Sequence, residues 1–170
     1  MLGLMQQRSL LISSLIDFAE KHHGDSEVVS RRVEGDIHRS DWAQVARRSR
    51  QVANALDAQK VPQGARIATL AWNGYRHLEL YFGVSGSGRV LHTINPRLHP
   101  EQMAWIANHA EDQILCFDMT FLPLVQALHA HCKTVTHFVA LCDADKLPAD
   151  TGIPNLLSYE AWMGRQPDTY

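Results

Sequence analysis

The chain has 170 residues, of which 45% are hydrophobic and 20% are charged, and these values are typical of a soluble globular protein with one main core. A net charge of −2 and a pI near 6.5 leave no dominant basic face, which argues against nucleic acid and membrane surfaces as partners. No apolar run approaches about 18 residues and no signal-peptide pattern is present, so we expect no membrane span. Three widely spaced cysteines favour a reducing cytoplasm over a disulfide scaffold.

The first forty residues predict one helix followed by two short strands. Residues 10–22 repeat apolar side chains at helical spacing, and Gly24 follows them as a stop signal. Residues 27–33 and 36–39 are typical of strands, with a turn between them at residues 34–35.

A second helix is predicted after Asp41. Asp41 and Gln44 form an approximate capping pair, and apolar residues then recur at helical spacing as far as residue 56. The basic run at residues 47–50 lies between those apolar positions, so we expect it to form a solvated helix face. Residues 62–64, which contain proline and glycine, close the helix.

The rest of the chain alternates between strands and helices. The predicted strands are residues 66–71, 90–94, 114–117 and 135–141. The predicted helices are residues 75–85, 101–109 and 121–130. Strands separated by single helices imply an α/β fold with a mostly parallel sheet and flanking helices. From residue 143 to 170 the pattern is less regular, and the last fifteen residues predict one short helix and a frayed end.

Two motifs suggest ligand sites but have simpler interpretations. Gly83, Gly86 and Gly88 fall at the end of a helix and before a strand, whereas a phosphate loop has the reverse order. Close helix packing and a glycine cap explain them better. His129 and Cys132 could share a helix face, but no second pair completes a metal site. We therefore expect no metal site, and the residues show no complete catalytic constellation.

The segment from residue 89 to 102 is the most informative. A β-branched strand meets Asn95 and Pro96, where proline removes a backbone donor and biases the preceding residue to an extended conformation. Pro100 then restarts the chain as a helix. The result is a polar loop between strand and helix that carries Arg97 and His99.

Four segments together resemble the adenylate-forming (AMP-binding) acyl-CoA ligases. Residues 37–45 are similar to the first core motif of that family, and residues 64–74 to its Gly-Asp-Arg-Val-Ala strand. Residues 75–86 continue the match, and residues 94–98 complete it. The order and spacing are most similar to the medium- and long-chain fatty acyl-CoA ligases and the methylmercaptopropionyl-CoA ligase type. The chain departs from the family at Arg89, where alanine is usual.

The resemblance implies a two-step reaction. A small carboxylic acid and ATP, with Mg2+, give an acyl-adenylate, and CoA then displaces AMP. The family's phosphate loop ending in Pro-Lys-Gly and its later adenine, ribose and lysine motifs are absent from this sequence. Residues 1–170 are therefore expected to be the N-terminal α/β subdomain of a longer ligase, inactive alone and packed against the remainder of that ligase, with a homodimer as a further expectation. Truncation is favoured over a natural short homologue. The alternatives are a non-catalytic module derived from this fold and a small unrelated Rossmann-like enzyme.

The resemblance also implies a function for the loop at residues 95–97. In similar ligases this loop lies where the nucleotide end of CoA docks, and the forked guanidinium of Arg97 suits phosphate. The alternative is an ordinary surface arginine that pairs with Glu101, four residues further on. Asn95 and Pro96 would shape the loop, and no catalytic residue is assigned.

If this chain normally packs against the rest of a ligase, the isolated chain should expose the apolar surface that the rest would cover. We expect self-association of the isolated chain through one or more of Trp72, Tyr75, Tyr81 and Phe82 unless they are interior.

Overall fold

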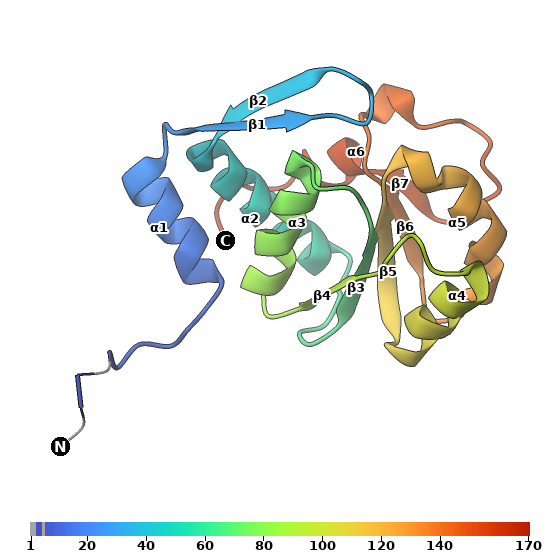
Figure 1. Cartoon of the computed structure of the whole chain (residues 1–170), viewed down its shortest axis with the longest axis horizontal. Helices are drawn as coiled ribbons and strands as arrows, with labels where there is room; N and C mark the ends of the chain where they lie inside the picture. Colours follow the sequence, from blue (N-terminus) through green and yellow to red (C-terminus); the bar gives the residue numbers. More distant parts are fainter. Residues whose placement is uncertain (1–2, 5) are drawn as a thin grey trace.

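A sheet of five parallel strands, in the order β4-β3-β5-β6-β7, forms the centre of the fold (Figure 1). This computed structural model describes residues 3–4 and 6–170. The strands are β3 (Arg66–Leu70), β4 (Val90–Thr93), β5 (Asp112–Phe117), β6 (His137–Ala140) and β7 (Leu156–Ser158). The predicted α/β class with a mostly parallel sheet is confirmed.

Helices cover both faces of the sheet (Figure 1). One face carries α2 (Trp42–Ala58), α3 (Tyr75–Gly86) and α6 (Tyr159–Met163). The opposite face carries α4 (Pro100–His109) and α5 (Leu122–Leu128), with the 3-10 turns Met119–Phe121 and His129–His131 on either side of α5. None of the helices within residues 3–4 and 6–170 is both long and apolar enough to cross a membrane.

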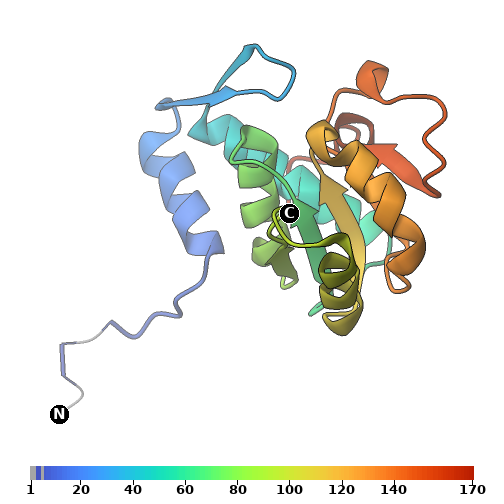
Figure 2. The same ribbon diagram turned by 45° about the vertical axis from the view of Figure 1, so that its right-hand side comes forward.

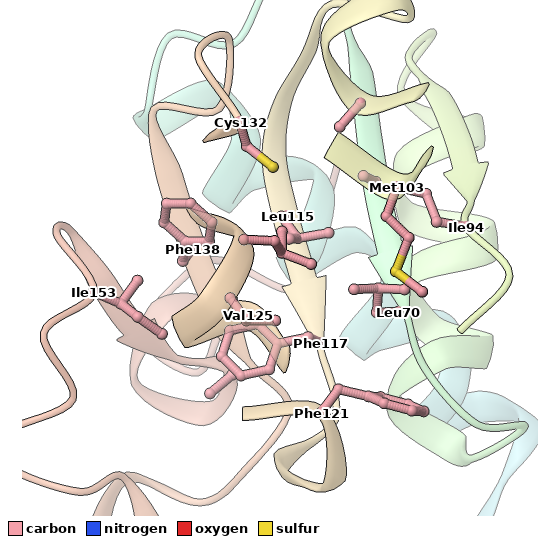
Figure 3. Packing of buried hydrophobic residues seen from close by; sticks show 14 of the residues in the cluster. Leu70, Ile94, Met103, Leu115, Phe117, Phe121, Val125, Cys132, Phe138 and Ile153 are labelled. Atoms are coloured by element: carbon pink, nitrogen blue, oxygen red, sulfur yellow. The ribbon is translucent and has the colours of Figure 1, made fainter. Parts of the chain in front are cut away.

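Successive side chains of a strand point to opposite faces, so each central strand supplies two cores. Leu115 and Phe117 of β5 point toward α4 and α5, where Met103 and Val125 pack against them (Figure 3). Ile114 of β5 points to the other face, among residues of α2, α3 and α6. Because both faces of β5 are buried, its last four residues, 114–117, are all apolar rather than alternating.

Gly83 sets how closely α2 and α3 approach one another. A Cβ at this position would lie 2.6 Å from the carbonyl oxygen of Ser49 and 2.7 Å from Cβ of Val52. At Gly86 the nearest atom to such a Cβ is 3.9 Å away. Gly88 has φ +74°, a conformation that glycine adopts without strain. Close packing is confirmed for Gly83 and the glycine cap for Gly88, whereas Gly86 serves neither purpose.

A two-stranded antiparallel hairpin, β1 (Glu27–Arg31) and β2 (Ile37–Asp41), precedes α2. The Asp41 carboxylate accepts a hydrogen bond from the Gln44 backbone N–H at 2.7 Å, which confirms the predicted helix cap. Before the hairpin, α1 (Ser13–His23) lies outside α2 and α3 (Figure 2). Gly24 follows α1 as predicted, but its φ of −55° is right-handed, so it is not a left-handed cap.

The last part of the chain is more ordered than the sequence indicated. The strand β7 was missed, although it forms one edge of the sheet. The expected frayed end is also wrong, because residues 166–169 lie along α2. Nε of Arg50 donates to the Asp168 carbonyl at 2.6 Å, and the Asn54 amide donates to the Thr169 carbonyl at 2.8 Å.

Candidate functional site at the carboxyl edge of the sheet

Polar residues gather where the parallel strands end. Trp72 follows β3, Asn95 follows β4, Asp118 follows β5 and Asp143 follows β6. The chain winds from β3 to β4 in one direction and then crosses to β5 on the other side of β3. In open α/β sheets, such a reversal of strand order places a ligand crevice at the carboxyl ends of the strands. This edge is therefore the candidate functional site.

The loop after β4 is held by its own polar groups. The Asn95 side-chain oxygen accepts from the Arg97 backbone N–H at 3.0 Å, and the Asn95 carbonyl accepts from the Leu98 N–H at 3.2 Å. At the start of α4, the side-chain oxygen of Gln102 accepts from the His99 backbone N–H at 3.2 Å. These bonds fix the backbone on both sides of Arg97, which is itself exposed.

The side chain of Arg97 forms no ion pair with any residue in the described part of the chain. The suggested pairing with Glu101 is not formed, because the nearest basic group to that carboxylate is His99, at 3.9 Å. The guanidinium thus projects from an ordered loop with its donors free for solvent or a ligand.

A second feature of this edge is a small hollow beside Asp118. The Asp118 carboxylate accepts a hydrogen bond from the Trp72 backbone N–H at 2.6 Å, and the Trp72 indole lies 5.2 Å from the Phe121 ring. Arg32 and Val33, which follow β1 in the hairpin, line the same hollow. Burial raises the pKa of Asp118 to about 6, so this carboxyl titrates close to neutral pH.

A buried network of ion pairs lies next to this hollow, and the sequence did not reveal it. Arg48 contacts Glu79 at 2.6 Å and Glu160 at 2.9 Å. Arg76 contacts Glu160 at 3.0 Å and Asp143 at 2.6 Å. Although burial raises the pKa of Glu160, the two arginines hold it below its usual range. The network joins α2, α3 and α6 to the carboxyl end of β6.

The predicted solvated face at residues 47–50 is therefore largely wrong. Only Arg47 is exposed, since Arg48 is in the buried network and Arg50 forms a paired contact with Glu20 of α1 at 2.7 and 2.8 Å. Arginine can bury its stem and satisfy its charge with distant carboxylates. Helical periodicity alone does not show those partners.

The two residues considered for metal binding behave as structural groups. Nδ1 of His129 contacts the Gln126 carbonyl at 2.9 Å, and Cys132 is buried in the core against α4 and α5. Within residues 3–4 and 6–170, no group of three or more metal-ligating side chains converges.

Comparison with known proteins identifies the family of the chain and agrees with its fold. A family profile described as AMP-binding enzyme matches residues 16–166, so the chain belongs to the AMP-binding enzyme family. The 3-methylmercaptopropionyl-CoA ligase of Ruegeria pomeroyi is 52% identical over 150 residues, which are 88% of this chain and 28% of that protein. The medium-chain-fatty-acid–CoA ligase of Ectopseudomonas oleovorans is 42% identical over 170 residues, which are 100% of this chain and 31% of that protein.

Solved structures show the same fold. The N-terminal domain of FACL13 from Mycobacterium tuberculosis superposes with a TM-score of 0.76 at 18% identity, covering 95% of this chain and 38% of that chain. The chain thus spans less than a third of the length of these curated relatives.

Proposed function

We propose that this chain is the N-terminal part of an ATP-dependent ligase that joins a small carboxylic acid to CoA. The observation that carries the proposal is the 52% identity to a 3-methylmercaptopropionyl-CoA ligase over 88% of the chain. In the proposed reaction, the substrate carboxylate attacks the α-phosphate of ATP and releases pyrophosphate. The CoA thiol then attacks the acyl carbonyl and releases AMP. Mg2+ would accompany ATP.

The relatives suggest which acids to test. One is named for 3-methylmercaptopropionate and another for medium-chain fatty acids, so short thioether acids and medium-chain acids are the proposed substrate class. Carboxylate-dependent exchange of labelled pyrophosphate into ATP measures the first step alone. The assay requires a ligase of the relatives' full length that carries this sequence as its N-terminal region. Absence of exchange with every acid of both classes would contradict the proposal.

The chain alone is proposed to be inactive in that assay, because its sequence has no Pro-Lys-Gly phosphate loop to position the triphosphate. We also propose a cytoplasmic location, which the three free, buried cysteines support. A homodimer remains part of the proposal and is testable by sedimentation.

The loop at Asn95, Pro96 and Arg97 is the proposed docking point for the nucleotide end of CoA. Two observations support this assignment: the Arg97 side chain has no carboxylate partner within the described residues, and the Asn95 side chain holds its backbone. A guanidinium without a carboxylate partner, on a loop with a fixed backbone, is suited to the phosphates of CoA. Asn95 and Pro96 would shape the loop without contacting the reacting atoms.

Arg97→Ala in the full-length ligase tests this assignment. We expect the Michaelis constant for CoA to rise by about 5- to 100-fold, the equivalent of one charge-assisted contact of about 1–3 kcal/mol. Pyrophosphate exchange without CoA should be nearly unchanged, because that step precedes CoA binding. Arg39→Ala, which removes an exposed arginine paired with Glu27 on the hairpin, is the matched control and should change neither step. Slower exchange with an unchanged CoA dependence would show that Arg97 serves adenylation instead.

A further inference from the structure

Large apolar side chains are exposed on the outer side of α1 and on the segment that leads into it. An amphipathic helix would bury its apolar side chains against the body, so these side chains need another explanation. Leu10 is 102% exposed, Leu11 58%, Ile12 48%, Leu15 64% and Phe18 57%. We call these five residues the α1 face. Ile16 alone among the apolar residues of α1 is classed as buried, against α2. The α1 face is therefore a different surface from the side of α1 that packs against α2.

The four aromatic residues named above for self-association expose less apolar surface than the α1 face. Tyr75 is buried and Phe82 is half-buried, whereas Trp72 and Tyr81 are exposed, on either side of His77. Scattered apolar residues of this kind are normal on a monomer, whereas a contiguous apolar stretch marks an interaction surface.

The C-terminal half of α1 is fixed to α2. The guanidinium of Arg50 in α2 forms two hydrogen bonds with the carboxylate of Glu20, at 2.7 and 2.8 Å. At the end of α1, the Gly24 carbonyl accepts from the Ala43 N–H at 3.0 Å. Residues 6–12 lead away from the body (Figures 1 and 2). The helical part of the α1 face, Leu15 and Phe18, is therefore positioned by the contacts of α1 with α2, whereas the other three residues lie on the segment that leads into the helix.

The charges around the α1 face do not suit a lipid surface. Arg8 and Lys21, with Arg47 and Arg50 of the adjoining α2, are the cations of this region, and Asp17, Glu20, Asp25 and Asp168 are its anions, so the two signs balance. Helices that lie on membranes carry an excess of lysine and arginine on the polar side. The region has no such excess, which favours a protein surface.

We propose that the α1 face packs against an apolar surface of the remaining part of the ligase's N-terminal domain; this inference rests on the proposed function. The chain covers only 38% of the solved N-terminal domain of FACL13, yet 95% of the chain superposes on it. In that relative, one domain therefore contains this fold and a larger amount of additional chain. The α1 face contributes five of the exposed large apolar side chains of the described residues, so additional chain that covered it would gain by their burial.

Thiol labelling of Leu15→Cys tests the proposal directly. The three natural cysteines of this chain are buried, and the label is read in both proteins on the peptide that carries the introduced thiol, so other cysteines of the long protein do not contribute. The labelling rate is measured in the 170-residue chain and in a ligase of the relatives' full length carrying this sequence. Each rate is divided by the rate of the same variant in denaturant. Phe18→Cys provides a second probe on the same face.

We expect both probes to label about 100-fold more slowly in the long protein, because labelling there must wait for local opening. Equal rates in the two proteins would overturn the proposal. Protection in the 170-residue chain that grows with its concentration would also overturn it, since a second copy would then be the occupant. Pyrophosphate exchange separates this inference from the proposed function. An active ligase with fast labelling refutes only the docking, and a ligase without exchange refutes the function whatever the labelling shows.

Discussion

Replacing Asp118 with asparagine should stabilise the protein at neutral pH. The Asp118 side chain is buried beside Trp72 and accepts the Trp72 backbone N–H at 2.6 Å. Asparagine keeps an oxygen for that hydrogen bond and matches the shape of the protonated acid. The substitution therefore removes the charge and leaves the contact in place.

The size of the effect follows from the pKa of this carboxyl, which burial raises from 3.8 to about 6. A raised pKa means that the folded state binds the proton more tightly than the unfolded state does. The stabilisation from that proton is complete below the unfolded pKa and is lost as the pH rises through about 6. Since each pKa unit corresponds to about 1.4 kcal/mol, ionisation at neutral pH costs the fold up to about 3 kcal/mol.

Urea unfolding of the native protein and of Asp118→Asn checks this at about pH 4 and about pH 7. At about pH 7 the free energy of unfolding of the variant should exceed that of the native protein by about 2 kcal/mol more than it does at about pH 4. Asp145→Asn is the matched control, because Lys146 holds the pKa of that exposed aspartate below its usual range. The stability of this variant relative to the native protein should therefore fall, not rise, as the pH increases. An advantage of Asp118→Asn that is the same at both pH values would refute the reasoning.

Two further substitutions test the packing of α2. Arg48→Met should lower the free energy of unfolding by about 3–5 kcal/mol, because it leaves the buried Glu79 carboxylate without its 2.6 Å partner. The control Arg47→Met, on the exposed side of the same helix, should stay within about 0.5 kcal/mol in the same denaturant titration. Gly83→Ala should cost about 1–3 kcal/mol, since its methyl group would meet Ser49 and Val52 at 2.6 and 2.7 Å. Gly86→Ala has open space and should stabilise α3 slightly or change nothing in thermal unfolding; equal losses at both glycines would contradict the packing argument.

The features predicted correctly are those specified by neighbouring residues. The Asp41 cap, the hairpin turn and the helix start at Pro100 all depend on side chains within a few positions of one another. The glycine pattern at residues 83–88 was also interpretable, because its position after a helix and before a strand excludes a phosphate loop.

The features that were missed depend on distant partners. Arg48 finds Glu79 31 residues away and Glu160 112 residues away, and helical spacing contains no signal for either. The strand β7 has three residues and owes its conformation to pairing with β6. Asp118 could have been suspected as a polar residue directly after a buried strand, but its raised pKa comes from burial that only the fold creates.

The contacts of Arg50 have a consequence for the time course of folding. Its guanidinium holds Glu20, 30 positions earlier, and the Asp168 carbonyl, 118 positions later. At about 5–20 residues per second, roughly 6 to 24 seconds of translation separate the synthesis of the two ends of that later contact. During this interval α2 has its apolar side ready but lacks β6 and α6, which complete its core. Contacts of such long sequence separation slow folding, so the apolar side of α2 on a ribosome-bound chain stays open to aggregation until the later elements arrive.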